Sequence, residues 1–199
     1  TLLRYKNPEQ CAEIYFKSQV LKYLPGNVLH FAYRHNETNK IGFAHKQLLK
    51  VGLFETIGLI VAALLVTNAL FLWPNQIPWL TNWLPVSYWL VLLLQILIIA
   101  TIIHTTKVLS AYLTLFCYLV YFFGMGFLTY GLIKVLGFET QPYLFITACF
   151  AASWLAGYVV PGAPGGMGVR EAVFILIASP QIVEAEALTL IALIRLISI

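Results

Sequence analysis

Four long apolar runs are the feature that most limits what this chain can fold into. They cover residues 48–73, 84–104, 108–136 and 143–160, and about 20 apolar residues are enough to cross a bilayer core. Apolar residues make up 60% of the chain and charged residues only 10%, against about 45–50% and about 25% in soluble domains. A single soluble core cannot bury this much apolar surface, so the sequence predicts an all-α, polytopic membrane helix bundle.

The flanks of these runs predict the orientation of the bundle. Eight of the twelve Lys and Arg residues lie within residues 1–50, whereas the loop at 74–83 has no charge and is flanked by tryptophans. Basic flanks face the cytoplasm and aromatic residues gather at membrane interfaces. We therefore expect an integral, multi-pass membrane protein, with one transmembrane domain over residues 1–199 that is incomplete at both ends.

The segment VVPGAPGGMGVREAVF, at residues 159–174, interrupts the apolar sequence with two prolines, four glycines and two opposite charges. Proline removes a backbone donor and glycine adopts conformations that other residues avoid, so a helix breaks here. Backbone groups freed inside a membrane must be buried in protein or line a wet cavity. The ten residues 169–178 that follow the break predict a helix about 15 Å long, half the thickness of a bilayer core.

A similar break occurs earlier in the chain, with the same Pro-Gly-x7-Arg spacing. The two copies are Pro25-Gly26 with Arg34, and Pro161-Gly162 with Arg170. Paired Pro/Gly interruptions in two halves of a membrane protein are a pointer to a transport site. We therefore predict two broken, re-entrant segments. They enter from opposite faces if residues 143–160 turn back, and from the same face if these residues cross the membrane fully.

The residues at these breaks form the predicted substrate-binding site. Freed N–H groups and the start of the following helix offer a seat for an anion, and the planar guanidinium of arginine matches a phosphate. Glu171 lies where the helix dipole favours a carboxylate and is placed to hold Arg170 until a ligand arrives. Glu55 either reaches the cytoplasmic interface or pairs with Arg34 or Arg170. The predicted site residues are Pro25, Gly26, Arg34, Glu55, Pro161, Gly162, Gly165, Gly166, Gly168, Arg170 and Glu171.

Other interpretations of the break are weaker or are excluded. A tight turn at the membrane surface, with Arg170 reaching the lipid head groups, is the remaining alternative. A nucleotide-binding loop is excluded because neither GxxxxGK[ST] nor a complete GxGxxG occurs. The three cysteines have no metal-binding spacing, and the chain has no Asp. We therefore expect no metal, no cofactor, no catalytic residues and no enzymatic activity. A membrane-embedded enzyme of lipid-phosphate chemistry is the alternative, which the lack of paired carboxylates and of a His–Asp arrangement disfavours.

Several of these segments resemble the flippase-like transmembrane family, also called the lysylphosphatidylglycerol synthase transmembrane region. They are residues 21–34, 50–65 and 161–172, followed by 192–196. The most specific part is the PGGxGxRE signature, which stands here as Pro164–Glu171. The resemblance covers most of the chain. The first motif departs from it, because KYLPGNVLHFAYR lacks the Gly-Glu that many members carry before the arginine.

The resemblance implies a bundle that moves or handles lipids in a bacterial-type plasma membrane. The expected function is that of a lipid flippase or lipid-binding transporter domain for an anionic or lipid-phosphate head group. The expected partners are membrane lipids, either phospholipids or polyprenyl-phosphate-linked lipids, and a glycosyltransferase or lipid-synthase partner, with no nucleic acid. The alternative is a non-catalytic membrane partner of a glycosyltransferase that builds lipid-linked glycans.

Overall fold

The structure is a computed structural model. It describes residues 8–20, 29–42, 44–72, 90, 93–97, 100–101, 109–139, 141–160, 163–179 and 182–198. Within these ranges every regular element is a helix and none is a strand, which confirms the all-α prediction. The elements are α1 (Pro8–Val20), α2 (Leu29–Lys40), α3 (His45–Thr67), η2 (Asn68–Leu72), α6 (Leu109–Val135), α7 (Tyr143–Val159), η4 (Pro164–Gly166), α8 (Val169–Ala178) and α9 (Glu184–Ser198).

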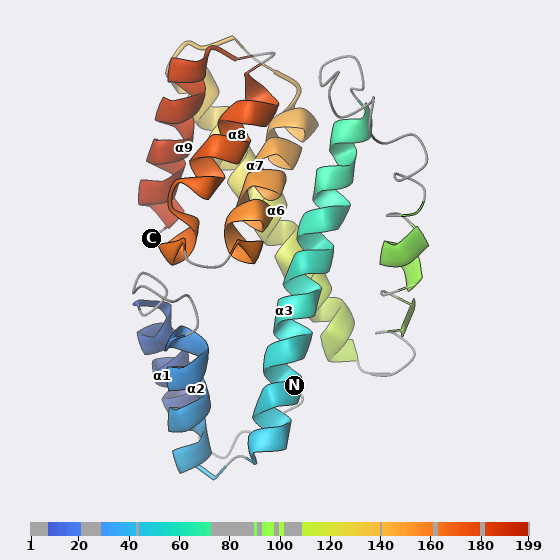
Figure 1. Cartoon of the computed structure of the whole chain (residues 1–199), viewed down its shortest axis with the longest axis vertical. Helices are drawn as coiled ribbons and strands as arrows, with labels where there is room; N and C mark the ends of the chain where they lie inside the picture. The colour runs from blue at the N-terminus through green and yellow to red at the C-terminus, as the bar shows by residue number, and fades with distance from the viewer. Residues whose placement is uncertain are drawn as a thin grey trace.

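Two groups of short helices lie at opposite ends of the long helix α3 (Figure 1). Helices α1 and α2 pack on each other beside the lower half of α3, whereas α7, α8 and α9 gather beside its upper half. Helix α2 begins near mid-height and runs down to the start of α3, whereas α7 runs down from the top and ends near mid-height. Helix α8 then returns upward, so the α1–α2 and α7–α8 hairpins enter the molecule from opposite ends.

Two of the described segments are long and apolar enough to cross a membrane. They are His45–Phe71, which combines α3 with most of η2, and Tyr112–Val135 of α6. These segments fall within or close to the predicted runs at 48–73 and 108–136. Helix α7 is apolar but has only 17 residues. The predicted run at 84–104 lies mostly outside the described residues and is helical at 93–97.

Helix α2 is longer than the sequence indicated. The sequence NVLHFAYR at 27–34 predicts a short helical piece, and residues 35–47 are polar and basic, but the helix continues to Lys40. Its polar side chains find partners one turn away: Thr38 donates to the backbone carbonyl of Arg34 at 2.6 Å, and Lys40 lies 2.6 Å from Glu37. These local contacts support a helix in a sequence that apolar periodicity alone does not identify.

The core is built around α7. Its buried residues divide between a cluster shared with α8 and α9, which includes Phe145, and a cluster shared with α3 and α6, which includes Phe150. Helix α6 approaches α7 closely at Gly126, where an added Cβ would lie 2.7 Å from Cγ2 of Thr147. Helix α7 therefore fixes the positions of the elements that carry the site.

Candidate functional site

The break between α7 and α8 is present in the described residues. Helix α7 ends at Val159, and the chain turns through η4 before α8 begins. Gly165, Gly166 and Gly168 have φ values of 58°, 75° and 81°, in the left-handed region that favours glycine. Three predicted site glycines therefore form the turn itself. Four other predicted site residues, Pro25, Gly26, Pro161 and Gly162, lie outside the described residues.

The side chain of Arg170 lies in a notch between two glycines. An added Cβ at Gly157 of α7 would lie 2.9 Å from its Nε, and one at Gly166 would lie 2.7 Å from the same atom. Beyond the notch, the guanidinium carbon is 5.5 Å from the centre of the Trp154 ring, which is within the range of a cation–π contact. The glycines thus direct Arg170 along α7 toward an aromatic face.

Glu171 pairs with Arg195 of α9, which differs from the expectation that it holds Arg170. Nη1 of Arg195 donates to Oε1 of Glu171, and its Nη2 lies 3.4 Å from the carbonyl oxygen of Gly165. The backbone N–H of Gly168 also faces the carboxylate. The chain's own carboxylate therefore occupies the start of α8, where we expected a seat for a ligand, and the Glu171–Arg195 pair fixes the turn.

Arg34 pairs with Glu55, which is one of the two arginine partners expected for this carboxylate. Nη2 of Arg34 lies 2.6 Å from Oε2 of Glu55, and Nη1 donates to Oε1 at 3.1 Å. The two side chains are 20% and 30% exposed. The guanidinium carbon also lies 5.7 Å from the centre of the Tyr15 ring. This bidentate pair joins the α1–α2 hairpin to α3.

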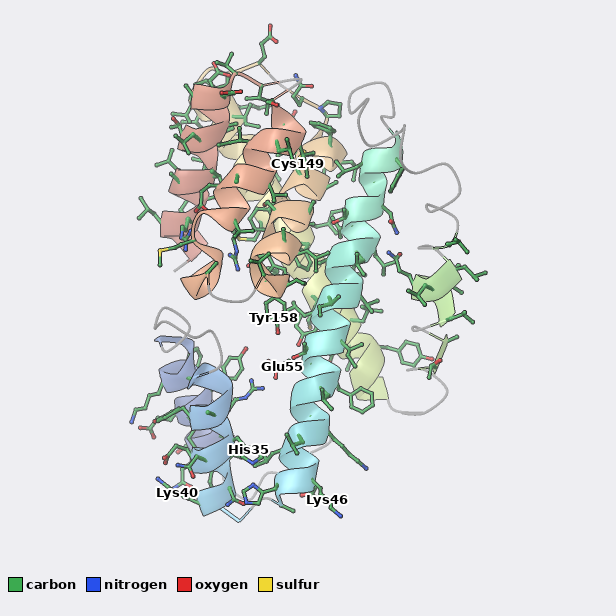
Figure 2. All side chains as sticks on the ribbon, viewed as in Figure 1. His35, Lys40, Lys46, Glu55, Cys149 and Tyr158 are labelled. Atoms are coloured by element: carbon green, nitrogen blue, oxygen red, sulfur yellow. The ribbon has the colours of Figure 1, made fainter. Side chains whose placement is uncertain are left out.

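Aromatic and hydroxyl side chains connect the surroundings of the two arginines. The hydroxyl of Tyr158 on α7 lies 3.5 Å from Oγ1 of Thr56, the residue after Glu55. The Tyr158 ring stacks on Trp154 at a centre-to-centre distance of 5.0 Å. Figure 2 shows Tyr158 and Glu55 close together near mid-height, between the two hairpins. We call this set of residues the central site: Arg34, Glu55, Thr56, Trp154, Tyr158 and Arg170.

Sequence reasoning identified Glu55 on α3 but missed Thr56 on the same helix and the residues of the central site that come from α7. Trp154, Gly157 and Tyr158 recur at helical spacing just before the break, which was the available signal, because side chains three and four apart share a helix face. Thr56 carries no signal apart from its position beside Glu55. Arg195 is a charge inside an apolar run, a pattern that indicates a functional or paired residue.

The described part of the chain holds no group of three or more His, Cys, Asp or Glu side chains that could bind a metal ion. No family model, curated protein or solved structure matches this chain. The resemblance to the flippase-like family therefore stays a prediction.

Proposed function

We propose that this chain is an integral membrane protein whose central site binds the anionic or phosphate-bearing head group of a lipid as the lipid moves between leaflets. One observation carries the proposal. Arg34 and Arg170 occupy equivalent positions of the repeated Pro-Gly-x7-Arg pattern, and both adjoin the connected side chains at mid-height. Two hairpins that enter from opposite ends and carry one arginine each resemble the inverted repeats of transporters that work by alternating access.

The membrane setting is supported by length, composition and exposure. Helices α3 and α6 have the length and hydropathy of full spans, and α6 exposes large apolar side chains such as Phe116 and Phe127, at 63% and 67%. We interpret the α1–α2 and α7–α8 hairpins as re-entrant segments. In that interpretation the turn at η4 lies inside the bilayer, where its backbone groups need protein or ligand partners. A bacterial-type plasma membrane rests on the resemblance alone.

The chemistry of the central site suits a phosphate group. A guanidinium presents a rigid fork of donors that matches two phosphate oxygens. Charge-assisted contacts of this kind are stronger where water is excluded. Trp154 and Tyr158 supply apolar faces with polar edges, which suit the boundary between a head group and its glycerol or prenyl portion. Glu55 is the carboxylate of this site, and we propose binding and movement of the lipid without covalent chemistry.

A transport assay tests this function. The purified protein is placed in vesicles that contain fluorescently labelled phosphatidylglycerol, and the rate at which label reaches the outer leaflet is followed with a membrane-impermeant quencher. We expect Arg34→Gln and Arg170→Gln each to slow this rate by about tenfold or more, equivalent to about 1.4 kcal/mol of binding energy in the rate-limiting state. Lys134→Gln is the matched control, because Lys134 is an exposed cation that contacts the Tyr130 ring near the end of α6.

The same assay tests which head groups the central site accepts. Labelled phosphatidylcholine, which has no net charge, tests whether the site selects anionic lipids. If both arginine variants move labelled phosphatidylglycerol as fast as the wild type and the lysine control, the central site does not carry lipid transport.

A further inference from the structure

The Arg34–Glu55 pair occupies the contact that a phosphate ligand of Arg34 would make. Both terminal nitrogens of Arg34 face both oxygens of Glu55, at 2.6 Å and 3.1 Å. A phosphate would use the same two donors in the same bidentate geometry. A lipid head group and Glu55 therefore compete for one guanidinium.

The Arg34–Glu55 and Arg195–Glu171 ion pairs differ in how firmly the carboxylate is held. Glu171 and Arg195 are each 19% exposed, and further contacts to the turn at Gly165 and Gly168 fix them. Glu55 is more exposed, at 30%. One turn earlier on α3, Gly52 presents no side chain to Arg34, and an added Cβ there would be 4.0 Å from Nη2. The exchangeable carboxylate is therefore Glu55, and Glu171 is the structural one.

The surroundings of Glu55 offer no second ion pair among the described residues. The titratable or charged side chains around the pair are Tyr15 of α1, whose ring lies beside Arg34, Tyr118 of α6, and Tyr158 of α7, whose hydroxyl lies beside Thr56. Of the other titratable residues on α2, Glu37 and Lys40 pair with each other, and Nε2 of His35 lies 2.5 Å from Nδ1 of His45 at the start of α3. Lys50 lies on the same helix, five residues earlier. A carboxylate that loses its guanidinium in such surroundings is left as an uncompensated charge in a mostly buried position.

We propose that an anionic lipid head group displaces Glu55 from Arg34 and that Glu55 takes up one proton from water as it is displaced. The negative charge of the phosphate then replaces that of the carboxylate on Arg34, and the proton neutralises Glu55. The net charge of the site is unchanged, so loading a head group is coupled to one proton. A proton gradient across the membrane is the driving force that this exchange can use. This inference rests on the proposed function, because it concerns the same ligand.

Binding of a soluble lipid at several pH values tests the exchange. The probe is dihexanoyl phosphatidylglycerol, whose phosphodiester keeps one negative charge from about pH 5 to about pH 8, so any proton taken up belongs to the protein. Affinity for the purified full chain is measured by calorimetry in two buffers with different ionisation enthalpies. We expect the wild type to bind up to about tenfold more tightly for each unit by which the pH falls, as uptake of one proton requires. The buffer difference should report up to one proton per bound lipid.

The Glu55→Gln variant tests both parts of the exchange, which are the competition for Arg34 and the uptake of a proton. Glu55→Gln removes the competing charge without changing the shape of the side chain, so it should bind at about pH 8 at least tenfold more tightly than the wild type and should lose the pH dependence. Glu139→Gln is the matched control, because Glu139 is an exposed glutamate outside the helices. Arg34→Gln should weaken binding at every pH.

The outcomes are distinguishable. If the wild type binds the probe with no pH dependence and no proton uptake, the exchange is wrong while the proposed function stands. The same holds if Glu55→Gln binds no more tightly than the wild type at about pH 8. If the wild type does not bind at any pH, the proposed function and the exchange both fail. The pH series on the wild type decides the proton coupling even if Glu55→Gln does not fold.

Discussion

Replacing Gly157 by alanine tests whether the notch between two glycines positions Arg170. The added Cβ would lie less than 3.0 Å from Cγ of Arg170, 2.9 Å from Nε and 3.2 Å from Cδ. Helix α7 and η4 cannot easily move together or apart to make room, because they pack directly on each other. A Cβ built at Gly166 is only 3.0 Å from both Cα and the carbonyl oxygen of Gly157. Arg170 must therefore leave its place over Trp154.

The magnitudes predict a loss of both stability and function. Alanine in a helix gains up to about 1 kcal/mol over glycine, whereas overpacking costs about 1–3 kcal/mol and the lost cation–π contact about 0.5–2 kcal/mol. The net loss of stability is about 0.5–4 kcal/mol by these figures. Transport should fall by about as much as in Arg170→Gln, since the guanidinium is displaced in Gly157→Ala and absent in Arg170→Gln.

Thermal unfolding and lipid transport are measured on the same preparations. Gly131→Ala is the matched control, because a Cβ at Gly131 of α6 meets nothing within 4 Å; it should leave stability unchanged or slightly raised and transport unchanged. If Gly157→Ala behaves like this control in both assays, the glycine notch does not position Arg170.

Two further substitutions test the contacts that support the site. Gly126→Ala should destabilise the protein by about 1–3 kcal/mol, because its Cβ would lie 2.7 Å from both Cβ and Cγ2 of the buried Thr147. Thermal unfolding measures this loss, and adding Thr147→Ala should restore part of it. If Gly126→Ala alone is as stable as the wild type, α6 and α7 do not approach each other closely at this position. Arg195→Gln should cost about 3 kcal/mol, since it leaves the carboxylate of Glu171 without its counter-charge in a largely buried position. Adding Glu171→Gln should recover much of this stability, and the absence of any recovery would show that the two side chains are not coupled.

The parts of the fold that sequence predicted best are those marked by local chemistry. The bounds of α8 agree with the predicted 169–178, because Gly168 and Pro180 mark its two ends in the sequence. The predicted end of the helical piece at residue 34 was wrong, because apolar periodicity does not identify polar residues that pair within one helix. The position of the first break cannot be compared, since Pro25 and Gly26 lie outside the described residues.

The sequence named both arginines of the candidate site and the carboxylate that pairs with Arg34, but not the residues that surround Arg170. The repeated spacing identified Arg34 and Arg170, and the apolar surroundings made Glu55 a candidate partner. Glu171 was assigned to its neighbour in sequence, whereas its partner is Arg195, 24 residues further along the chain. Contacts between helices, such as that of Gly157 with Arg170, depend on packing that a single sequence does not encode in any short pattern.

The central claim is that a lipid head group reaches the side chains between the two hairpins, and photo-crosslinking tests it most directly. Tyr158 is replaced by p-benzoylphenylalanine, and the protein is irradiated in membranes that contain phosphatidylglycerol with a labelled phosphate. We expect a crosslink that soluble dihexanoyl phosphatidylglycerol suppresses and that Arg170→Gln weakens. The same replacement at Phe127, an exposed residue on α6, should give a crosslink that the soluble lipid leaves unchanged. A crosslink at position 158 that is absent, or that responds to competition no more than the one at position 127, would contradict the account.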